Sequence, residues 1–317
     1  MTTPQVVKVH SVALKGKPLD GEYPVLKLDE ENVVIRHPEF GAVRIKRVNT
    51  DLPASAPVTL SYDDLKAEIR ERFATLNRLI SGVISGRQRS VIVSGAPGVG
   101  KTFTVESMLD AAKKDGTIRK VTLVRGTISP IGFYVLLWEN RRAGEIIVLD
   151  DSDALFGSED GANLMKAATD SGKKRTVSYL KEVAMLEANG IPKTFQYEGS
   201  IIVASNIDFE REIASKSKIS MHLSAVLNRA LYLDLGLHSK QALMARVEDV
   251  ATSTDMLRDL GLDDDGVKTV VAWLKDNQAT VRSLSLRTAE RLAGLILTEP
   301  DTWKRTAKST LLKAVQR

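Results

Sequence analysis

Residues 94–102 read SGAPGVGKT, and this stretch places three glycines and a proline directly before a Lys-Thr pair. A loop that wraps a polyphosphate must turn its backbone N–H groups inward, which requires backbone conformations that side chains disfavour and a close approach to the anion. Gly95, Gly98 and Gly100 supply that freedom, and Pro97 limits the entropy of the unfolded loop. The stretch therefore predicts a phosphate-binding loop of the pattern G-x-x-x-x-G-K-S/T.

The flanking sequence gives this loop the context that the pattern requires. The apolar run SVIVSG (90–95) predicts a strand before it, and TFTVESMLDAAKK (102–114) predicts a helix after it. The positive end of that helix would face the phosphates, Lys101 would reach the β- and γ-phosphates, and the Thr102 hydroxyl would ligate Mg²⁺. We therefore expect ATP and Mg²⁺ as cofactors, bound by Gly95, Ala96, Pro97, Gly98, Val99, Gly100, Lys101, Thr102 and Phe103.

Two later apolar runs end in polar side chains. EIIVLDDSD (145–153) ends in carboxylates, and SIIVASNID (200–208) leads into Ser205-Asn206. In a parallel sheet, Asp150 would lie beside the phosphates and hold Mg²⁺ through water, while Asp151 would orient or deprotonate the attacking water. The Asn206 amide would donate to the γ-phosphate or position that water. The structural alternatives are a solvated turn after the first run and an Asx turn after the second.

The hydrophobic pattern divides the chain into three parts. Residues 1–56 read as short strands with turns between them, ending in a proline-containing linker, and predict a small β-rich module. Residues 57–236 begin with a helical pattern and then alternate helices with apolar runs, as a parallel sheet covered on both faces requires. Residues 237–317 are helical only. We expect an α/β fold whose nucleotide-binding core carries a helical lid and a basic C-terminal helix.

Composition limits the remaining classes of function. The chain has no cysteine, which excludes disulfides, zinc-thiolate sites and cysteine nucleophiles. The first residues lack the apolar run of a secretory signal, and no stretch is apolar over the length of a membrane span. We therefore expect an intracellular, cytoplasmic protein. The formal charge of +5 permits a nucleic-acid partner without requiring one.

With these motifs in order, residues 60–298 resemble the AAA+ ATPases. The resemblance assigns the loop at 95–102 to Walker A, Asp150-Asp151 to Walker B and Asn206 to sensor 1. By position, Arg229 in LNRALYL matches the arginine finger, which a neighbouring subunit supplies, and Arg287 in SLSLRTAE matches sensor 2. The family fold is a three-layer αβα sandwich, and the resemblance implies a ring, commonly of six subunits. The segment from GTISPIGFYVLLWENRR onward is similar to small AAA+ ATPases encoded by bacteriophages.

The Walker B pair differs from the pattern that many family members have, and this difference affects the expected rate of ATP hydrolysis. Many family members have Asp-Glu at Walker B, where this chain has Asp150-Asp151. A shorter carboxylate must sit closer to the water or the rate falls. A nucleotide-gated scaffold with little turnover therefore stays an alternative to a motor.

The sequence says least about the macromolecule on which the ATPase acts. Phe133 and Tyr134 could form an aromatic pore loop but are expected in the core, because they recur at helical spacing with other apolar residues. The segment from 173 to 200 reads as a long β-hairpin with Asn189-Gly190 at its turn. Tyr179 or Phe195 could stack on bases there. Nucleic-acid phosphates would be contacted by Lys173, Lys174, Arg175, Lys181 and Lys193.

Our interpretation is an ATP-hydrolysing ring that remodels or translocates nucleic acid. The alternatives are a protein remodeller that recruits its partner through residues 1–56, and the scaffold. A solvated basic loop is the structural alternative for the hairpin. The C-terminal segment could add nucleic-acid affinity or cover the lid through Trp303, Leu311 and Val315.

Overall fold

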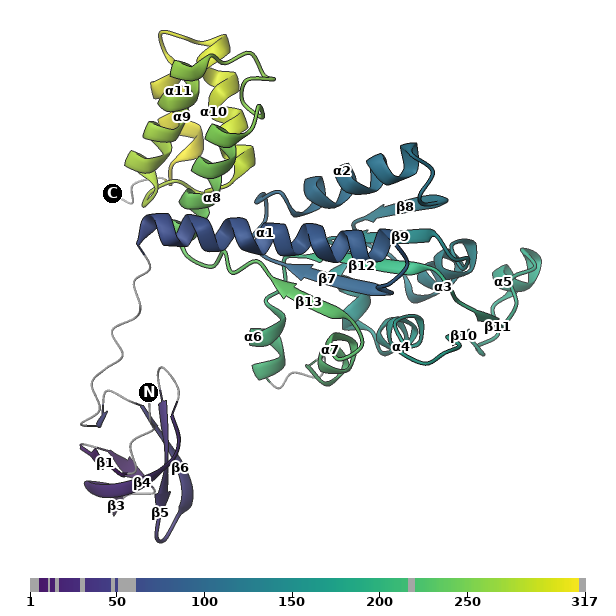
Figure 1. The fold of residues 1–317 in the computed structure, drawn as a ribbon, viewed down its shortest axis with the longest axis horizontal. Helices are drawn as coiled ribbons and strands as arrows, with labels where there is room; N and C mark the ends of the chain where they lie inside the picture. Colours follow the sequence, from purple (N-terminus) through teal and green to yellow (C-terminus); the bar gives the residue numbers. More distant parts are fainter. Residues whose placement is uncertain are drawn as a thin grey trace. The chain divides into compact units, whose positions relative to one another are not determined.

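The structure is a computed structural model, and the chain in it forms two compact units, residues 1–61 and 62–317. The residues that it describes are 6–10, 12–14, 17–28, 32–46, 49–50, 61–215 and 220–313. The predicted boundary at residue 56 lies outside these ranges. Each unit is described by itself below (Figure 1).

The first unit is a small antiparallel β module, as the sequence predicts. Its main sheet has the order β1-β4-β5-β6, from β1 (Val6–Val9), β4 (Gly21–Leu28), β5 (Asn32–His37) and β6 (Gly41–Lys46). A two-stranded sheet pairs β2 (Ala13–Leu14) with β3 (Lys17–Pro18). Alternate residues point inward, because side chains on a strand have a period of two. The buried set is Val7, Val9, Leu19, Val33, Ile35, Val43 and Ile45.

The edge of β1 that does not face β4 also has a backbone partner in this unit. Val9 bridges Thr50 in antiparallel fashion, and the His10 N–H donates to the Asn49 carbonyl at 2.8 Å. Strand β1 therefore has partners on both sides, β4 on one and residues 49–50 on the other. Residues 49–50 therefore cover the end of this edge, where backbone groups would otherwise be available to another chain.

The second unit is built on a five-stranded parallel sheet of order β13-β7-β12-β9-β8. The strands are β7 (Ser90–Ser94), β8 (Lys120–Arg125), β9 (Glu145–Asp150), β12 (Ser200–Ser205) and β13 (Leu231–Asp234). Every residue of the central strands β7 and β12 is buried, which explains why these strands read as continuous apolar runs.

Helices cover both faces of this sheet, which makes it a three-layer αβα sandwich (Figure 1). On one face α1 (Tyr62–Ile84) and α2 (Lys101–Lys114) pack on the side chains of Val91, Val93 and Val148. The other face is covered by α3 (Pro130–Glu139), α4 (Glu159–Ala168), α6 (Phe209–Ala214) and α7 (Ser220–Leu227). Phe133 and Tyr134 are fully buried in that second layer, so the prediction that they belong to the core is confirmed.

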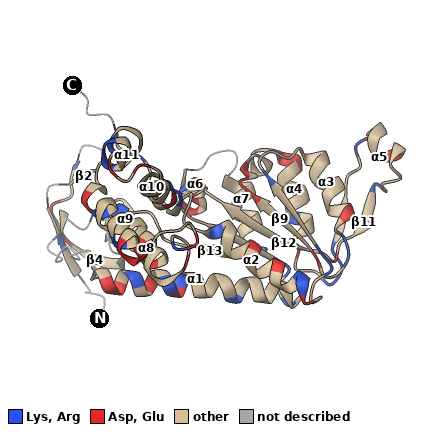
Figure 2. Ribbon diagram, turned by 90° about the horizontal axis from the view of Figure 1, so that it is seen from above, with Lys and Arg blue, Asp and Glu red and all other residues tan. Residues whose placement is uncertain are grey.

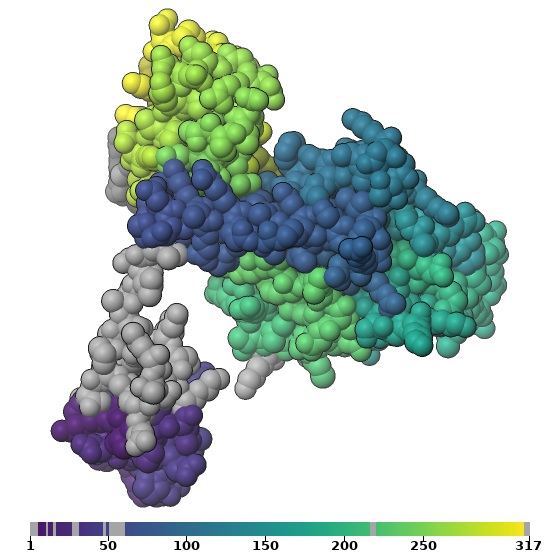
Figure 3. Space-filling view, viewed as in Figure 1, coloured from purple at the N-terminus to yellow at the C-terminus, as the bar shows by residue number. Residues whose placement is uncertain are grey.

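The last four helices form the lid with a hydrophobic core of its own. They are α8 (Lys240–Ser253), α9 (Asp264–Asn277), α10 (Leu286–Thr298) and α11 (Trp303–Leu311). Trp303 and Leu311 are buried in that core. The C-terminal helix therefore covers the lid, which is one of the two roles that the sequence predicted for it. Val315 lies outside the described residues. Figure 3 shows α1 running along the surface from the lid to the core of the same unit.

A partly buried ionic cluster joins α1 to the lid. The carboxylate of Glu248 on α8 accepts hydrogen bonds from the Tyr62 hydroxyl at 2.7 Å, from Lys66 at 2.9 Å and from Lys275 of α9 at 2.7 Å. Burial acts to raise the pKa of Glu248, but the three hydrogen bonds outweigh it and lower the pKa to about 2. Elsewhere along α1 acidic and basic residues are interspersed on the surface (Figure 2).

The lowered pKa predicts how Glu248 contributes to stability. The folded-state pKa lies below the ordinary value of 4.5, so the contribution is present above pH 4.5 and is lost as the pH falls toward 2. We expect Glu248→Gln to lower the free energy of unfolding by about 3 kcal/mol at neutral pH and by much less near pH 2. Urea unfolding over this pH range measures it, with Glu182→Gln on the exposed surface as control. An equal cost at both pH values would contradict the assignment.

Candidate nucleotide-binding site

The glycine-rich loop lies between β7 and α2, where the sequence predicts it. Gly98 (φ 71°) and Gly100 (φ 99°) have left-handed backbone conformations, which glycine adopts without strain. A Cβ at Gly98 would come within 2.8 Å of the Ser285 Cβ, so the lid approaches the loop too closely for any larger residue. The Leu286 N–H donates to the Gly98 carbonyl at 2.9 Å, which ties the start of α10 to the loop.

Lys101 is folded into the loop at the first position of α2. Its ammonium donates to the carbonyls of Gly95 at 2.6 Å and Ala96 at 3.0 Å, and to Asn206 Oδ1 at 2.8 Å. Burial lowers the pKa of Lys101 to about 8, although the charges of Asp151 and Asp150 act in the opposite direction. Three acceptors thus hold the cation at the point where a phosphate would meet it.

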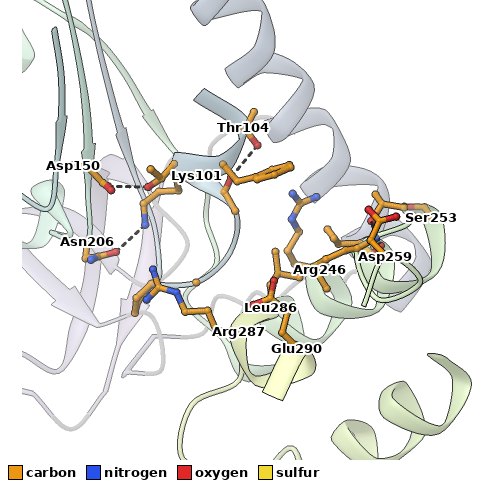
Figure 4. Close-up of a pocket in the computed structure, with 18 of the residues that line it drawn as sticks. Lys101, Thr104, Asp150, Asn206, Arg246, Ser253, Asp259, Leu286, Arg287 and Glu290 are labelled. Carbon is orange, nitrogen blue, oxygen red and sulfur yellow. Dashed lines mark hydrogen bonds between the residues drawn. The ribbon is translucent and has the colours of Figure 1, made fainter. Parts of the chain in front are cut away.

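The polar residues that follow β9 and β12 converge on this loop, as predicted from adjacent parallel strands. The Thr102 hydroxyl donates to Asp150 Oδ1 at 2.8 Å, and the Asn206 amide donates to Asp151 Oδ1 at 2.6 Å. Figure 4 shows Lys101 facing Asn206, with Asp150 on the neighbouring strand. The arrangement forms a chain of contacts from Lys101 through Asn206 to Asp151.

The backbone of Asp151 gives a physical reason for the Asp-Asp pair. Asp151 has φ 52°, and among the described residues it is the one non-glycine with a positive φ. Asp and Asn populate this left-handed region several-fold more often than most residues, because their short side chains tolerate it. The Asp151 N–H donates to the Ala204 carbonyl at 3.1 Å, which holds the turn against β12.

A pocket of about 700 Å³ extends from the loop to the lid. Phe103 lines it and is 76% exposed, and Figure 4 shows Arg287 extending from α10 toward Lys101 and Asn206. Pro97, Gly98 and Gly100 also line it, whereas the remaining loop residues Gly95, Ala96 and Val99 are absent from its lining and contribute through their carbonyls. On the lid side the lining residues are Arg246, Val250, Ser253, Thr254, Asp255, Met256, Asp259, Leu286, Arg287 and Glu290.

Two arginines at the site were not predicted from the sequence. Arg246 on α8 donates through Nε to the Val99 carbonyl at 3.2 Å and stacks on Phe73 of α1, 3.4 Å from the ring centre. Burial lowers its pKa to about 10. Arg125 at the end of β8 pairs with Glu106 and lies 3.7 Å from Asp150 Oδ2. An arginine ending the strand beside β9 was a possible signal for Arg125, but nothing in the sequence singles out Arg246.

Arg229 does not line this pocket. It lies between α7 and β13 and lines a separate cavity of about 320 Å³ together with Lys166, Asp170 and Thr176. Its Nη1 donates to the Ala225 carbonyl at 2.7 Å, and its Nε lies 3.9 Å from Asp170. The structure therefore separates Arg229 from the other predicted catalytic residues of the same chain.

The predicted β-hairpin is present but differs from the expectation in its tip. Strands β10 (Thr176–Ser178) and β11 (Thr194–Gln196) pair antiparallel, and α5 (Ala184–Ala188) lies between them. The AMLEA segment favours helix over strand by its intrinsic propensity. Asn189-Gly190 is therefore not a hairpin turn: it ends α5, with Gly190 in the left-handed conformation (φ 64°).

The structure corrects two predicted contacts of this hairpin. Arg175 is buried and donates to the carbonyls of Ala168 and Gly199, both at 2.8 Å, so its guanidinium has a structural role and is not available to phosphates. Phe195 is buried against Tyr134 and Trp138, so it cannot stack on a base.

Of the other predicted cations, Lys181 pairs with Asp160, and Lys193 lies 3.8 Å from Glu187. Lys173 and Lys174 are exposed, and no polar partner for either is found within the described residues.

The helices in the described part of the chain include none with the length and apolar character that a membrane span needs.

The chain is similar in sequence to a phage-encoded protein. The chain is 39% identical over 247 residues to an uncharacterized 36.7 kDa protein encoded in the nrdC-mobD intergenic region of Enterobacteria phage T4, and the match covers 78% of this chain and 75% of that protein. No family model matches the sequence.

Solved structures with a similar chain path include a DNA replication initiation factor (14% identity, 77% of this chain and 65% of that one, TM-score 0.42). They also include NtrX from Brucella abortus in complex with ATP (15%, 73% and 52%, 0.44) and Rhizobiales Trip13 (16%, 78% and 96%, 0.38). Likenesses of this size assign no activity.

The glycine-rich loop, the acidic and amide residues at the ends of β9 and β12, and the helical lid against the loop occur together on an αβα sandwich of strand order β13-β7-β12-β9-β8. The chain belongs to one family with the phage T4 protein, and the motifs of its site resemble those of the AAA+ ATPases.

Proposed function

We propose that this protein binds Mg·ATP between its sandwich and its lid and hydrolyses it as a head-to-tail oligomer. The observation that carries the proposal is the contact chain Lys101–Asn206–Asp151 beside the glycine-rich loop, with Thr102 and Asp150 in hydrogen-bond contact next to it. A cation, a hydroxyl, an amide and two carboxylates within one pocket are the groups that phosphoryl transfer to water requires.

The residues present fit a magnesium ion that is bound together with a nucleotide. Thr102 and Asp150 are 2.8 Å apart and supply oxygen ligands of the kind that Mg²⁺ prefers. Within the described residues no cluster of three or more His, Cys, Asp or Glu could hold a metal by itself. The ion would therefore share phosphate oxygens and water, and it would neutralise charge on the phosphates.

Each residue then has a role that follows from its position. Lys101 would exchange its carbonyl acceptors for phosphate oxygens, because a charged phosphate oxygen is a stronger hydrogen-bond acceptor than a peptide carbonyl. The Asn206 amide would then position the attacking water, and Asp151 would accept its proton. Arg287 lies in the first turn of the lid helix α10, so contact with the phosphates would couple their loss to lid movement.

The position of Arg229 supports the proposed assembly. A guanidinium that stabilises the transferred phosphoryl group must reach it, and Arg229 lies outside its own pocket. Arg229 would therefore act on the nucleotide of a neighbouring copy, and head-to-tail contacts of this kind would form a ring where the rotation between copies closes. Six subunits are the number that the family resemblance implies.

One experiment tests the function directly. Purified protein should bind a fluorescent ATP analogue with Mg²⁺ present and release phosphate from ATP. Binding without release would identify the nucleotide-gated scaffold instead. Absence of binding, with a circular dichroism spectrum of a folded protein, would contradict both.

We propose that the ATPase remodels or translocates nucleic acid, DNA or RNA, inside a bacterial or phage-infected cell. Lys173 and Lys174 would contact the phosphates of that nucleic acid. Arg89 donates to the carbonyls of Asp170 at 3.0 Å and Gly172 at 2.7 Å, which fixes the loop that presents the two lysines. A protein substrate is the second candidate, because Leu180 and Met185 at the hairpin tip are 74% and 42% exposed. A partner could also be recruited by the N-terminal module.

The two candidates predict different results for the hairpin. If nucleic acid is gripped, changing Lys173 and Lys174 together to Ala should reduce the slope of log affinity against log salt by about two, because two phosphate contacts are lost. Fluorescence polarisation with single- and double-stranded DNA and RNA measures this slope. Lys181→Ala is the matched control, since Lys181 already pairs with Asp160. No salt-dependent binding by the wild type would exclude nucleic acid and favour the protein candidate.

A further inference from the structure

The cavity beside Arg229 contains a second cation to which no role has been assigned. Lys166 on α4 and Arg229 line it together, with Asp170 as the single carboxylate of its lining. Lys166 is partly exposed, and no hydrogen bond or ion pair to it is found in the part of the chain that the structure describes. Helices α4 and α7 pack side by side (Figure 1). Lys166 lies on α4 and Arg229 directly follows α7, so this packing brings the two cations to the same cavity.

This cavity lies at the opposite end of the sheet from the nucleotide pocket. The Ser90 hydroxyl, at the first residue of β7, donates to the Arg229 carbonyl at 3.4 Å. Arg89 just before it donates to the Asp170 carbonyl. The glycine-rich loop follows the other end of the same strand, five residues later, which is about 16 Å at 3.3 Å per residue. Lys166 therefore cannot act on the nucleotide of its own chain.

The two cavities are complementary in charge. The nucleotide pocket is lined by five carboxylates and three cations, and a bound triphosphate adds further negative charge at its mouth. The smaller cavity has two cations to one carboxylate. Complementary patches on opposite ends of one molecule favour head-to-tail contact between copies.

The fixed position of Arg229, with Lys166 beside it in the same cavity, favours a single anionic group over an extended nucleic-acid backbone. Arg229 is held by the Ala225 carbonyl at 2.7 Å and by Asp170 at 3.9 Å, so its guanidinium is positioned before any ligand arrives. A nucleic-acid strand is tracked by a row of cations along a groove, whereas a terminal phosphate fits two cations in one concave site.

We propose that Lys166 is a second residue acting in trans, which contacts the triphosphate bound to the neighbouring copy alongside Arg229, with Asp170 as the residue that positions Arg229. This inference rests on the proposed function as a head-to-tail ATPase. Removal of the ammonium in Lys166→Met should lower kcat roughly 10²–10³-fold, as for loss of one donor that stabilises charge in the transition state. Lys166→Arg should restore most of the activity.

A mixing experiment separates a role in trans from a structural one. Lys166→Met subunits have intact nucleotide pockets, and Lys101→Ala subunits have intact Lys166 and Arg229. In an equal mixture about one quarter of the interfaces combine both intact halves, so activity should rise toward one quarter of the wild-type value. Lys113→Met, an exposed lysine on α2 outside both cavities, is the matched control and should behave as wild type. Loss of activity that mixing does not restore would overturn the proposal.

A second measurement does not depend on turnover. Sedimentation velocity with Mg²⁺ and a non-hydrolysable ATP analogue should show assembly of the wild type at lower protein concentration than Lys166→Met. Without nucleotide the two proteins should behave alike. If Arg229→Ala abolishes hydrolysis while Lys166→Met equals Lys113→Met in both assays, Lys166 has no such role and the proposed function stands. If the wild type assembles with nucleotide through Lys166 but releases no phosphate, hydrolysis fails and this inference stands. If it neither assembles nor hydrolyses, both are overturned.

Discussion

Replacing Asp151 by Asn is expected to lower kcat roughly 10²–10⁴-fold, the usual effect of removing a general base. The change is nearly isosteric, and Asn tolerates the left-handed conformation of this position (φ 52°) as well as Asp does. The loop, Lys101 and Thr102 are untouched, so ATP affinity should change little. Steady-state phosphate release together with binding of a fluorescent ATP analogue measures both quantities.

The control for this prediction is Asp110→Asn, which removes an exposed carboxylate from α2 outside the pocket. It should leave both kcat and affinity unchanged. If Asp151→Asn hydrolyses ATP as fast as the wild type, Asp151 is not the base, and the water must be activated by another group. If it loses ATP affinity instead, Asp151 supports the loop through Asn206 rather than the chemistry.

Replacing Arg229 by Ala is expected to lower kcat by roughly 10³-fold or more, as for the loss of an arginine finger. ATP binding to each isolated subunit should persist, because Arg229 does not line the pocket of its own chain. Phosphate release at increasing protein concentration measures the effect. The wild-type rate per subunit should rise with concentration as the oligomer forms, and the variant should stay slow throughout.

Subunit mixing gives this prediction a test that a folding defect cannot imitate. Arg229→Ala subunits supply intact pockets, and Lys101→Ala subunits supply intact arginines, so an equal mixture should recover about one quarter of the wild-type activity. Arg119→Ala, at an exposed arginine just before β8, should match the wild type alone and in mixtures. A mixture that stays inactive would contradict action in trans.

The sequence predicted the frame of the site because its residues lie next to elements with strong periodicity. The loop at 95–102 follows a fully buried strand, and Asp150 and Asn206 follow or end similar strands, so a parallel sheet must bring them to one edge. The β-rich nature of the first module and the helical nature of the lid were predicted in the same way, from the pattern of apolar residues.

The hairpin shows where this reasoning fails. Arg175 and Phe195 were expected to meet a nucleic acid, and both are buried in the core. Alternation along a short strand does not reveal which face another helix will cover, and here the Tyr134 and Trp138 side chains of α3 decide it. Asn-Gly can end a helix as well as turn a hairpin, because both need the left-handed conformation that Gly190 adopts.

The sequence by itself determined the phosphate loop, the strand ends that meet it and the order of sheet and lid, since these depend on local conformation and on residues adjacent along the chain. Only the tertiary structure decided that Arg246 and Arg125 join the site, that Lys166 shares a cavity with Arg229, and that this cavity lies at the far end of β7. These contacts join residues tens of positions or more apart. Which distant side chains meet is set by how helices pack on the two faces of the sheet, and no local pattern encodes that packing.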